Sequence, residues 1–152
     1  MQGMVMADLA LLRVLQLASP SMPVGAFSYS QALELVVEQG IVRDRASAMT
    51  WLRDQLTLNL ARNDAPLFCR LFDAALSDDA SALRRWNNYW LATRESAELR
   101  AEALNMGAAL RRILPDAGYA SDAALARLGD MAEISYATAF AYASARAGRS
   151  WC

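Results

Sequence analysis

The chain has 152 residues, enough for one domain with a hydrophobic core, and a formal charge of −1 from 15 arginines and 16 acidic residues. This balance gives no electrostatic case for a nucleic-acid partner. Histidine is absent and the two cysteines, Cys69 and Cys152, are far apart, so neither an intrinsic metal site nor the usual general base is expected. The sparse cysteines indicate a cytoplasmic protein.

The apolar share of the chain is 55%, above the usual ~45–50% of soluble proteins. It predicts either a very compact helical domain or an apolar surface that a partner covers. Asp8 and Arg13 interrupt the only early apolar run, so we expect neither a signal peptide nor a membrane span.

The first predicted elements are two helices. Residues 1–7 are expected to be a flexible leader, and Asp8 is placed to cap a helix that ends near Ala18. The second helix is expected to end near Gln39, with Gly40 directly after it. The faces predicted to be buried are Leu11, Leu12, Leu15 and Ala18 in the first helix, and Leu33, Val36 and Val37 in the second.

The corner between these helices is the least generic stretch of the chain. Pro20, Pro23 and Gly25 fall within six residues; proline fixes φ and removes a donor, whereas glycine tolerates positive φ. The residues alone allow either a passive loop or a recognition corner that offers Phe27 and Tyr29 to a partner. The candidate partner-binding residues are Pro23, Gly25, Phe27, Ser28, Tyr29, Ser30 and Glu34.

Three further helices are predicted in the middle of the chain. Asp44 is placed to cap the first, Asp64 to cap the second with Pro66 in its first turn, and residues 77–81 to turn into the third. Cys69 flanks the apolar face of the second helix and is expected to be a buried thiol. The predicted buried faces are Ala48, Trp51, Leu52, Leu56 and Leu60, then Leu67, Phe68, Leu71, Phe72 and Ala75, then Leu83, Trp86 and Trp90.

The last third of the chain contains the strongest helical pattern. Gly107 lies inside that helix, where it costs ~1 kcal/mol against alanine, so we expect another helix to approach closely there. A loop at 114–118 and a short helix ending near Leu128 follow. Small side chains dominate 132–147, which predicts a helix with neighbours on several sides. The whole chain is predicted to be a single all-α domain, a bundle of about seven helices.

Charge is concentrated at residues 93–100, in a chain that is only 20% charged. Arg94 and Glu98 are spaced to pair on one helix face. This stretch is interpreted either as a set of surface ion pairs or as a support that satisfies backbone groups of the corner. The candidate support residues are Arg94, Glu95, Glu98, Arg100 and Gly107.

Catalytic motifs are missing. The glycines form no phosphate-binding loop, and a nucleophilic serine would lack both a histidine and a lysine partner. The chain is therefore predicted not to be an enzyme. The alternative that stays open is a helical enzyme that uses Glu34, Glu95 or Glu98 as acid or base beneath the corner.

Four motifs in order resemble the UreF family of urease accessory proteins. The corner Pro20-Ser-Met-Pro-Val-Gly-Ala-Phe-Ser-Tyr-Ser-Gln-Ala-Leu-Glu34 resembles the family pattern SPxLPVGGFSYSxGLE. The others are Trp51-Leu52 followed by Asp64-Ala-Pro66, the stretch 92–100, and Met106-Gly107 before the apolar residues at 110–114.

This resemblance implies an all-α, non-enzymatic homodimer that binds UreD (also called UreH), the GTPase UreG and apo-urease. It implies that the protein helps nickel insertion into the urease active site, while the partner proteins handle nickel and GTP, and that no cofactor is bound directly. It also suggests a UreG contact centred on Phe27 and Tyr29. Nucleic acid and membrane are not among the implied partners.

Two departures from the family pattern stand out. Ala26 and Ala32 replace glycines, so the geometry of the corner is expected to differ slightly. Family members usually continue well beyond the helix near 132–147, so the C-terminal helices of the family are expected to be missing. The remaining alternative is a helical adaptor for an unrelated partner.

Overall fold

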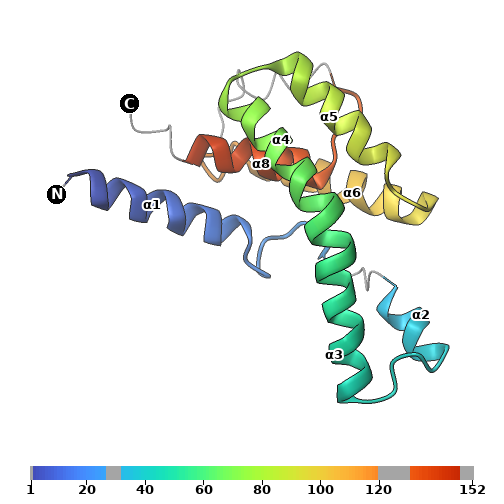
Figure 1. The fold of residues 1–152 in the computed structure, drawn as a ribbon. Coiled ribbons are helices and arrows are strands. Elements are labelled where there is room, and N and C mark those ends of the chain that lie inside the picture. The colour runs from blue at the N-terminus through green and yellow to red at the C-terminus, as the bar shows by residue number, and fades with distance from the viewer. Residues whose placement is uncertain (1, 27–31, 120–130, 148–152) are drawn as a thin grey trace.

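The computed structural model describes residues 2–26, 32–119 and 131–147, with side chains from Leu9 onward. These residues form seven α-helices and one π-helical segment, η2, and none of them lies in a β-strand (Figure 1). The all-α prediction is confirmed. In chain order the elements are α1 (Gln2–Leu17), α2 (Leu33–Glu38), α3 (Arg45–Asp54), η2 (Gln55–Asp64), α4 (Ala65–Leu76), α5 (Ala80–Ala92), α6 (Ala97–Ile113) and α8 (Tyr136–Ala147).

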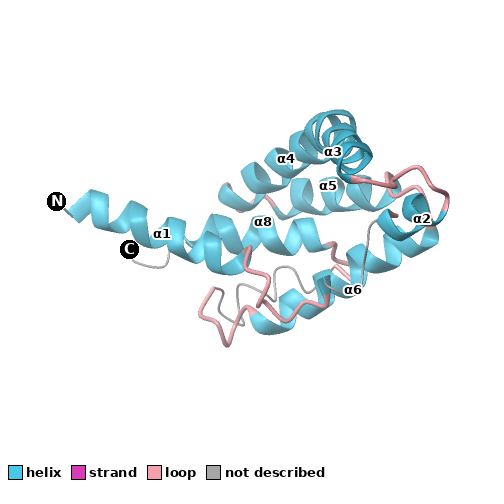
Figure 2. Cartoon of the chain, turned by 90° about the horizontal axis from the view of Figure 1, so that it is seen from below, coloured by secondary structure: helices cyan, strands magenta, loops and turns pink. Residues whose placement is uncertain are grey.

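Helix α8 is the centre of the core. It packs against α4 and α6 and more lightly against α1 and α5, and Figure 2 shows it between α4 and α5 on one side and α6 on the other. Eight residues of α8 are buried, and most are alanines, so neighbouring helices approach it closely. The prediction of a last helix with neighbours on several sides is confirmed.

The helices α4, α5, α6 and α8, with the loops between them, form what we call the C-terminal body. The faces predicted for α4 and α5 are confirmed, because Leu71 and Leu83 are buried and Phe68, Phe72 and Trp86 pack against the core; Leu110 of α6 is buried as well. Cys69, by contrast, is exposed, so the prediction of a buried thiol is wrong. It lies at the edge of the α4 face, where one helical position decides between core and solvent.

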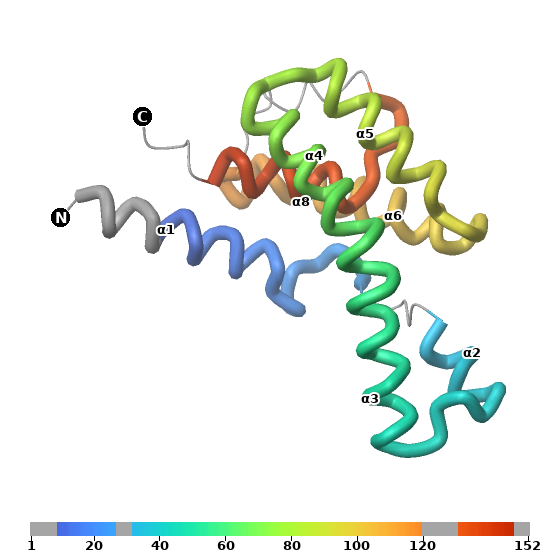
Figure 3. The backbone as a smooth tube through the Cα atoms, viewed as in Figure 1, coloured from blue at the N-terminus to red at the C-terminus, as the bar shows by residue number. Residues whose placement is uncertain are grey.

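The N-terminal region, made of α1, α2, α3 and η2 with the loops between them, buries far less. Helix α1 extends to one side of the body, and α2 and α3 extend away from it in another direction (Figure 3). Among its described side chains only Leu17 and, in the corner, Val24 are buried. The apolar stripes predicted for these helices do form, but they face outward: Leu11, Leu12, Leu15, Leu33, Val37, Leu52, Leu56 and Leu60 are all exposed.

Helix boundaries agree with the sequence at some points and differ at others. Helix α1 begins at Gln2, so residues 2–7, expected to be a flexible leader, are helical. Asp44 caps α3 as predicted, with its carboxylate accepting from Ser47 N at 2.8 Å. Gly40 follows α2 with φ of 70°, as a helix C-terminus favours. The predicted short helix ending near Leu128 lies outside the described residues.

The predicted break at Asp64 is absent. Asp64 has helical backbone angles and caps nothing, and the helix runs on from α3 through η2 into α4. The Ala65 N–H bonds to Leu60 O, five residues back, in the wider π register. Pro66 stands where the register changes, in the first turn of α4, so its missing N–H costs little.

Candidate functional site

The described part of the corner is a tight and partly anchored turn. Met22 N donates to Ser19 O at 3.0 Å and Val24 N to Met22 O at 2.8 Å, while the Val24 side chain inserts into the core. Pro23 and Gly25 are exposed on either side of this anchor. Gly25 has φ of 79°, a conformation that other residues adopt only with strain.

The remaining corner residues divide into two groups. Phe27, Ser28, Tyr29 and Ser30 lie outside the described residues, so their role as partner contacts stays a prediction. Glu34 lies in the first turn of α2 and is exposed. Ala32, where the family pattern has glycine, has φ of 69°, so this alanine holds the left-handed backbone that glycine adopts at least cost.

Arg94 does not pair with Glu98, as the helical spacing suggests. Its guanidinium donates to Asp64 Oδ1 at 2.7 Å and lies over the Trp90 ring, 4.7 Å from the centroid. Both members of the ion pair are mostly buried, with side chains 18% and 16% exposed. The pair therefore ties the end of η2 to the end of α5. Residues 30 positions apart make this contact, which no local pattern reveals.

Arg100 and Gly107 converge on the segment that leads into α8. Arg100 makes two hydrogen bonds to the Glu133 carboxylate, at 2.6 and 3.3 Å, and these lower the pKa of Glu133. A Cβ on Gly107 would lie 2.7 Å from the carbonyl carbon of Ser135 and 2.8 Å from Tyr136 N. The close approach predicted at Gly107 is confirmed, and its partner is the backbone in front of α8.

Asn87 completes this anchor, and sequence reasoning missed it. It is fully buried; its amide donates to Glu133 O at 2.9 Å and accepts from Ser135 N at 2.9 Å and from Thr138 Oγ1 at 2.8 Å. A polar residue amid the apolar face of α5 is the signal that could have found it. Arg94 donates hydrogen bonds to Asp64 and Thr93, and Arg100 donates to Glu133. None of these acceptors lies in residues 20–26 of the corner. Because residues 27–31 of the corner lie outside the described residues, the support role of these side chains stays a prediction.

Glu95 and Glu98 have different surroundings. Glu98 is exposed in the first turn of α6, where hydrogen bonds from its own backbone N–H and from Ser96 lower the pKa of its carboxyl. Glu95 lines a polar hollow of about 340 Å³ between η2, α5, α6, the start of α8 and Ala32, the residue before α2. The other polar side chains that line it are Gln55, Asn59, Asp64, Arg94, Glu102 and Tyr136.

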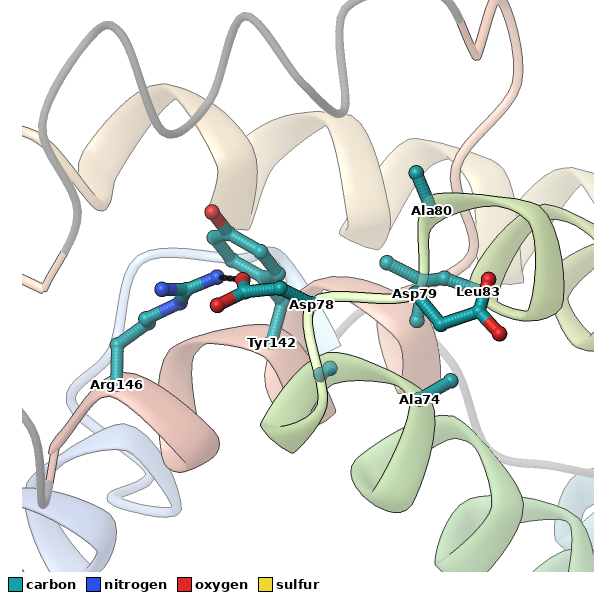
Figure 4. A pocket seen from close by; sticks show the side chains of 8 residues that line it. Ala74, Asp78, Asp79, Ala80, Leu83, Tyr142 and Arg146 are labelled. Carbon is teal, nitrogen blue, oxygen red and sulfur yellow. Dashed lines mark hydrogen bonds and ion pairs between the residues drawn. The ribbon is translucent and has the colours of Figure 1, made fainter.

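A second ion pair closes the far end of the body. Asp78, in the turn between α4 and α5, pairs with Arg146 near the end of α8, and the guanidinium lies 4.8 Å from the centroid of Tyr142 (Figure 4). The pocket beside it holds about 20 Å³, which suits at most a water molecule. This pair therefore fixes the end of α8 rather than forming a binding site.

The largest candidate surface is apolar. Of the fourteen large apolar side chains described as exposed, twelve belong to the N-terminal region and only Leu76 and Tyr89 to the body. These side chains lie on α1, α2, α3 and η2 and, at Ile41, in a loop between them, and contiguous exposed apolar patches are typical of surfaces that a partner covers. The composition carried this signal, since one of the two explanations for the 55% apolar share was a surface for a partner. Sequence reasoning instead placed eight of these twelve side chains on faces predicted to be buried.

Two properties of the described residues bear on other functions. No three of their histidine, cysteine, aspartate or glutamate side chains gather in a way that could hold a metal ion. Their helices also lack the combination of length and hydropathy needed to cross a membrane.

Comparison with known proteins gives concordant matches. A family model described as UreF matches residues 42–150. The urease accessory protein UreF of Pseudomonas putida is 55% identical over 108 residues, which cover 71% of this chain and 48% of that protein. UreF of Delftia acidovorans is 44% identical over 149 residues, covering 92% of this chain and 63% of that protein. A bifunctional urease accessory protein UreEF of Bordetella bronchiseptica is 44% identical over 110 residues.

The extent of these matches matters in two ways. An alignment over 92% of a 152-residue chain necessarily includes the corner at 20–34, although the family model begins only at Val42. The chain spans about half to three fifths of the length of these UreF relatives.

Proposed function

This chain belongs to the UreF family of urease accessory proteins, and on that premise we propose that it is a non-catalytic scaffold for the maturation of urease. In this proposal it assembles in the cytoplasm with UreD/UreH and the GTPase UreG on apo-urease. A second copy of the chain forms a homodimer with it. Nickel and GTP are bound by the partner proteins, and this chain modulates how nucleotide state is coupled to nickel insertion.

The observation that carries the proposal is the exposed apolar face of the N-terminal region. Leu11, Leu12 and Leu15 are 58%, 61% and 57% exposed on α1, although they stand at the spacing of a helix face that packs against a neighbour. Covering such a face with a partner contributes roughly 25 cal/mol per Å² of apolar area. A scaffold needs surfaces of this kind, whereas a catalyst needs a site with reactive groups.

The alternative of a helical enzyme has one observation in its favour, the polar hollow that Glu95 and Glu102 line. Glu34 and Glu98 do not line it, and Asp64 in its wall is already paired with Arg94. The lowered pKa of Glu98 also makes that carboxyl a poor proton donor near neutral pH. We therefore favour the scaffold.

Capture from a mixture of purified components tests the proposal. The chain, carrying an affinity tag, is incubated with UreD/UreH and UreG, and the captured proteins are quantified. We expect UreD/UreH to be captured first and UreG to follow. Replacing Leu11, Leu12 and Leu15 together by serine should lower capture by more than tenfold, because a buried apolar anchor typically contributes ≥ 2 kcal/mol.

The matched control is Leu76→Ser. Leu76 is 42% exposed but lies at the end of α4, on the body, so this variant should be captured like the wild type. Equal capture of the triple variant and the wild type would place the contact away from α1. No capture of either partner by the folded wild-type chain would refute the scaffold proposal.

A further inference from the structure

A groove between η2, α4 and α5, which we call the arginine groove, stands apart from both the corner and the polar hollow. It has a volume of about 470 Å³. Its lining combines two arginines, two aromatic rings and short polar or apolar side chains, and no carboxylate: Arg62, Asn63, Pro66, Leu67, Arg70, Trp86, Tyr89 and Thr93.

The positive charge of the groove is not compensated within the described residues. Their ion pairs use Arg94, Arg100 and Arg146, and none of them involves Arg62, Arg70 or Arg85. Arg70, which lines the groove, and Arg85, which does not, each lie near the Trp86 ring, with guanidinium carbons 5.2 and 5.3 Å from its centroid. In a chain of net charge −1, this is a local excess of positive charge. An anion in the groove would relieve the repulsion between these cations.

Arg70 is also held ready for a ligand. One of its terminal nitrogens donates to Pro66 O at 2.9 Å, and its guanidinium lies over the indole of Trp86. A guanidinium carries five N–H donors, so most of them stay available for a carboxylate. A side chain fixed in this way loses little conformational freedom on binding, and its planar fork matches a carboxylate with two hydrogen bonds.

Half of the side chains that line the groove are apolar or aromatic. Pro66 and Leu67 line it from α4, and Tyr89, 55% exposed, lies with its ring centroid 6.1 Å from that of Trp86, edge to face. A bare inorganic anion would leave these walls in water. A ligand that offers a carboxylate beside an apolar side chain would satisfy both halves of the groove.

We propose that the arginine groove is a docking site for a short acidic segment of a partner protein, one in which carboxylates alternate with apolar side chains. A peptide is favoured over a nucleic acid because half of the lining is apolar or aromatic and the chain has no overall positive charge to attract a polyanion. The inference does not depend on the urease assembly, since it rests on charge and shape alone.

Fluorescence anisotropy with defined probes tests the docking site. The main probe is a labelled peptide of about eight residues that alternates glutamate with leucine. Its matched controls are a glutamine–leucine peptide without charge, a glutamate–serine peptide without apolar side chains, and a single-stranded oligonucleotide. We expect saturable binding of the first peptide that weakens with added salt, and at least about tenfold weaker binding of all three controls.

Variants locate the binding in the groove. Arg70→Gln and Arg62→Gln should each weaken binding about tenfold, because each removes charge-assisted hydrogen bonds, and Tyr89→Ala should weaken it several-fold. Arg84→Gln, on α5 but outside the groove, removes the same charge and should bind like the wild type. Arg62 and Tyr89 are exposed, so their variants test the groove even if Arg70→Gln loses stability.

Three outcomes would overturn the proposal. They are no binding of the glutamate–leucine peptide by the wild type, equal binding by Arg62→Gln and the wild type, and tighter binding of the oligonucleotide than of the peptide. The last outcome would assign the groove to nucleic acid instead. None of these three outcomes would change the expected capture of UreD/UreH. The docking site and the scaffold function can therefore be refuted independently of each other.

Discussion

The N-terminal region and the C-terminal body are built from the same kind of helix but treat their apolar faces in opposite ways. In the body, Leu71 and Leu110 are fully buried around α8. In the N-terminal region, Leu12 and Leu52 also belong to the apolar faces of their helices, but they are 61% and 48% exposed. The two regions differ in what covers the apolar face, and not in the helices themselves.

This contrast teaches that helical periodicity identifies a face but not its partner. An apolar stripe forms because leucines recur every three or four residues, and that is a property of one segment. Whether the stripe is buried depends on which other segment lies against it. The body contains its own covering helix, α8, whereas the N-terminal region presents its stripe outward, where another protein chain can cover it.

The largest expected effect comes from truncating one leucine in each region. Leu71→Ala removes a fully buried side chain from the core and should cost about 2–5 kcal/mol of unfolding free energy. Leu52→Ala removes a half-exposed side chain from α3 and should cost less than about 0.5 kcal/mol. Urea denaturation at low protein concentration measures both.

The concentration dependence sharpens the result. If a second copy covers the N-terminal region, the cost of Leu52→Ala should rise with protein concentration, while that of Leu71→Ala should not. Equal costs for the two variants in the dilute protein would mean that α3 is buried within the chain, and the contrast between the regions would fail.

Sequence reasoning succeeded where a local rule was enough. Asp44 caps α3 because its carboxylate reaches Ser47 N within the same turn. Asp64 is also an aspartate in front of a helical pattern, with Pro66 two residues later, yet it pairs with Arg94 and the helix continues. Nothing within a few residues of Asp64 distinguishes the two cases, because the deciding partner is contributed by a different helix.

The candidate site follows the same division. The exposed Pro23 and Gly25 and the crowded Gly107 were visible as breaks of local rules, a proline and glycine corner and a glycine inside a helix. The hydrogen-bond partners of Asn87, the role of Glu133 and the arginine groove were not visible, since they exist only when α4, α5, α6 and α8 are assembled. The family resemblance was readable from the order of motifs, but it does not say that Arg100 and Gly107 hold the entry of α8.

A second prediction tests whether packing or helix propensity decides at Gly107. Propensity alone says that Gly107→Ala should stabilise α6 by ~1 kcal/mol. The backbone of Ser135 and Tyr136 leaves no room for a Cβ, so we expect instead a loss of about 1–3 kcal/mol, or roughly 3–10 °C in Tm.

The control for Gly107→Ala is its neighbour. Ala108 is exposed on the same helix, so Ala108→Gly should cost ~1 kcal/mol through propensity alone. Differential scanning calorimetry compares the three proteins. A higher Tm for Gly107→Ala would show that the segment before α8 can move away, and that the body is less tightly packed than Gly107 indicates.

The smallest expected effect concerns the backbone of the N-terminal region, at the two ends of the corner. Ala32 holds a φ of 69°, which costs alanine roughly 1–2 kcal/mol, so Ala32→Gly should stabilise α2 by up to about 1 kcal/mol after the entropy of the unfolded glycine is counted. Gly25 is the opposite case: its φ is 79° and nothing lies within 4 Å of the position that a Cβ would take, so Gly25→Ala should destabilise the protein by a similar amount through the backbone alone.

Hydrogen exchange of the Val36 amide, which bonds to Ala32 O at 3.1 Å, should slow several-fold in Ala32→Gly, while amides of α8 stay unchanged because the body does not depend on α2. Slower exchange in α8 as well would mean that the N-terminal region and the body unfold as one cooperative unit, and faster exchange at Val36 would mean that Ala32 is not strained.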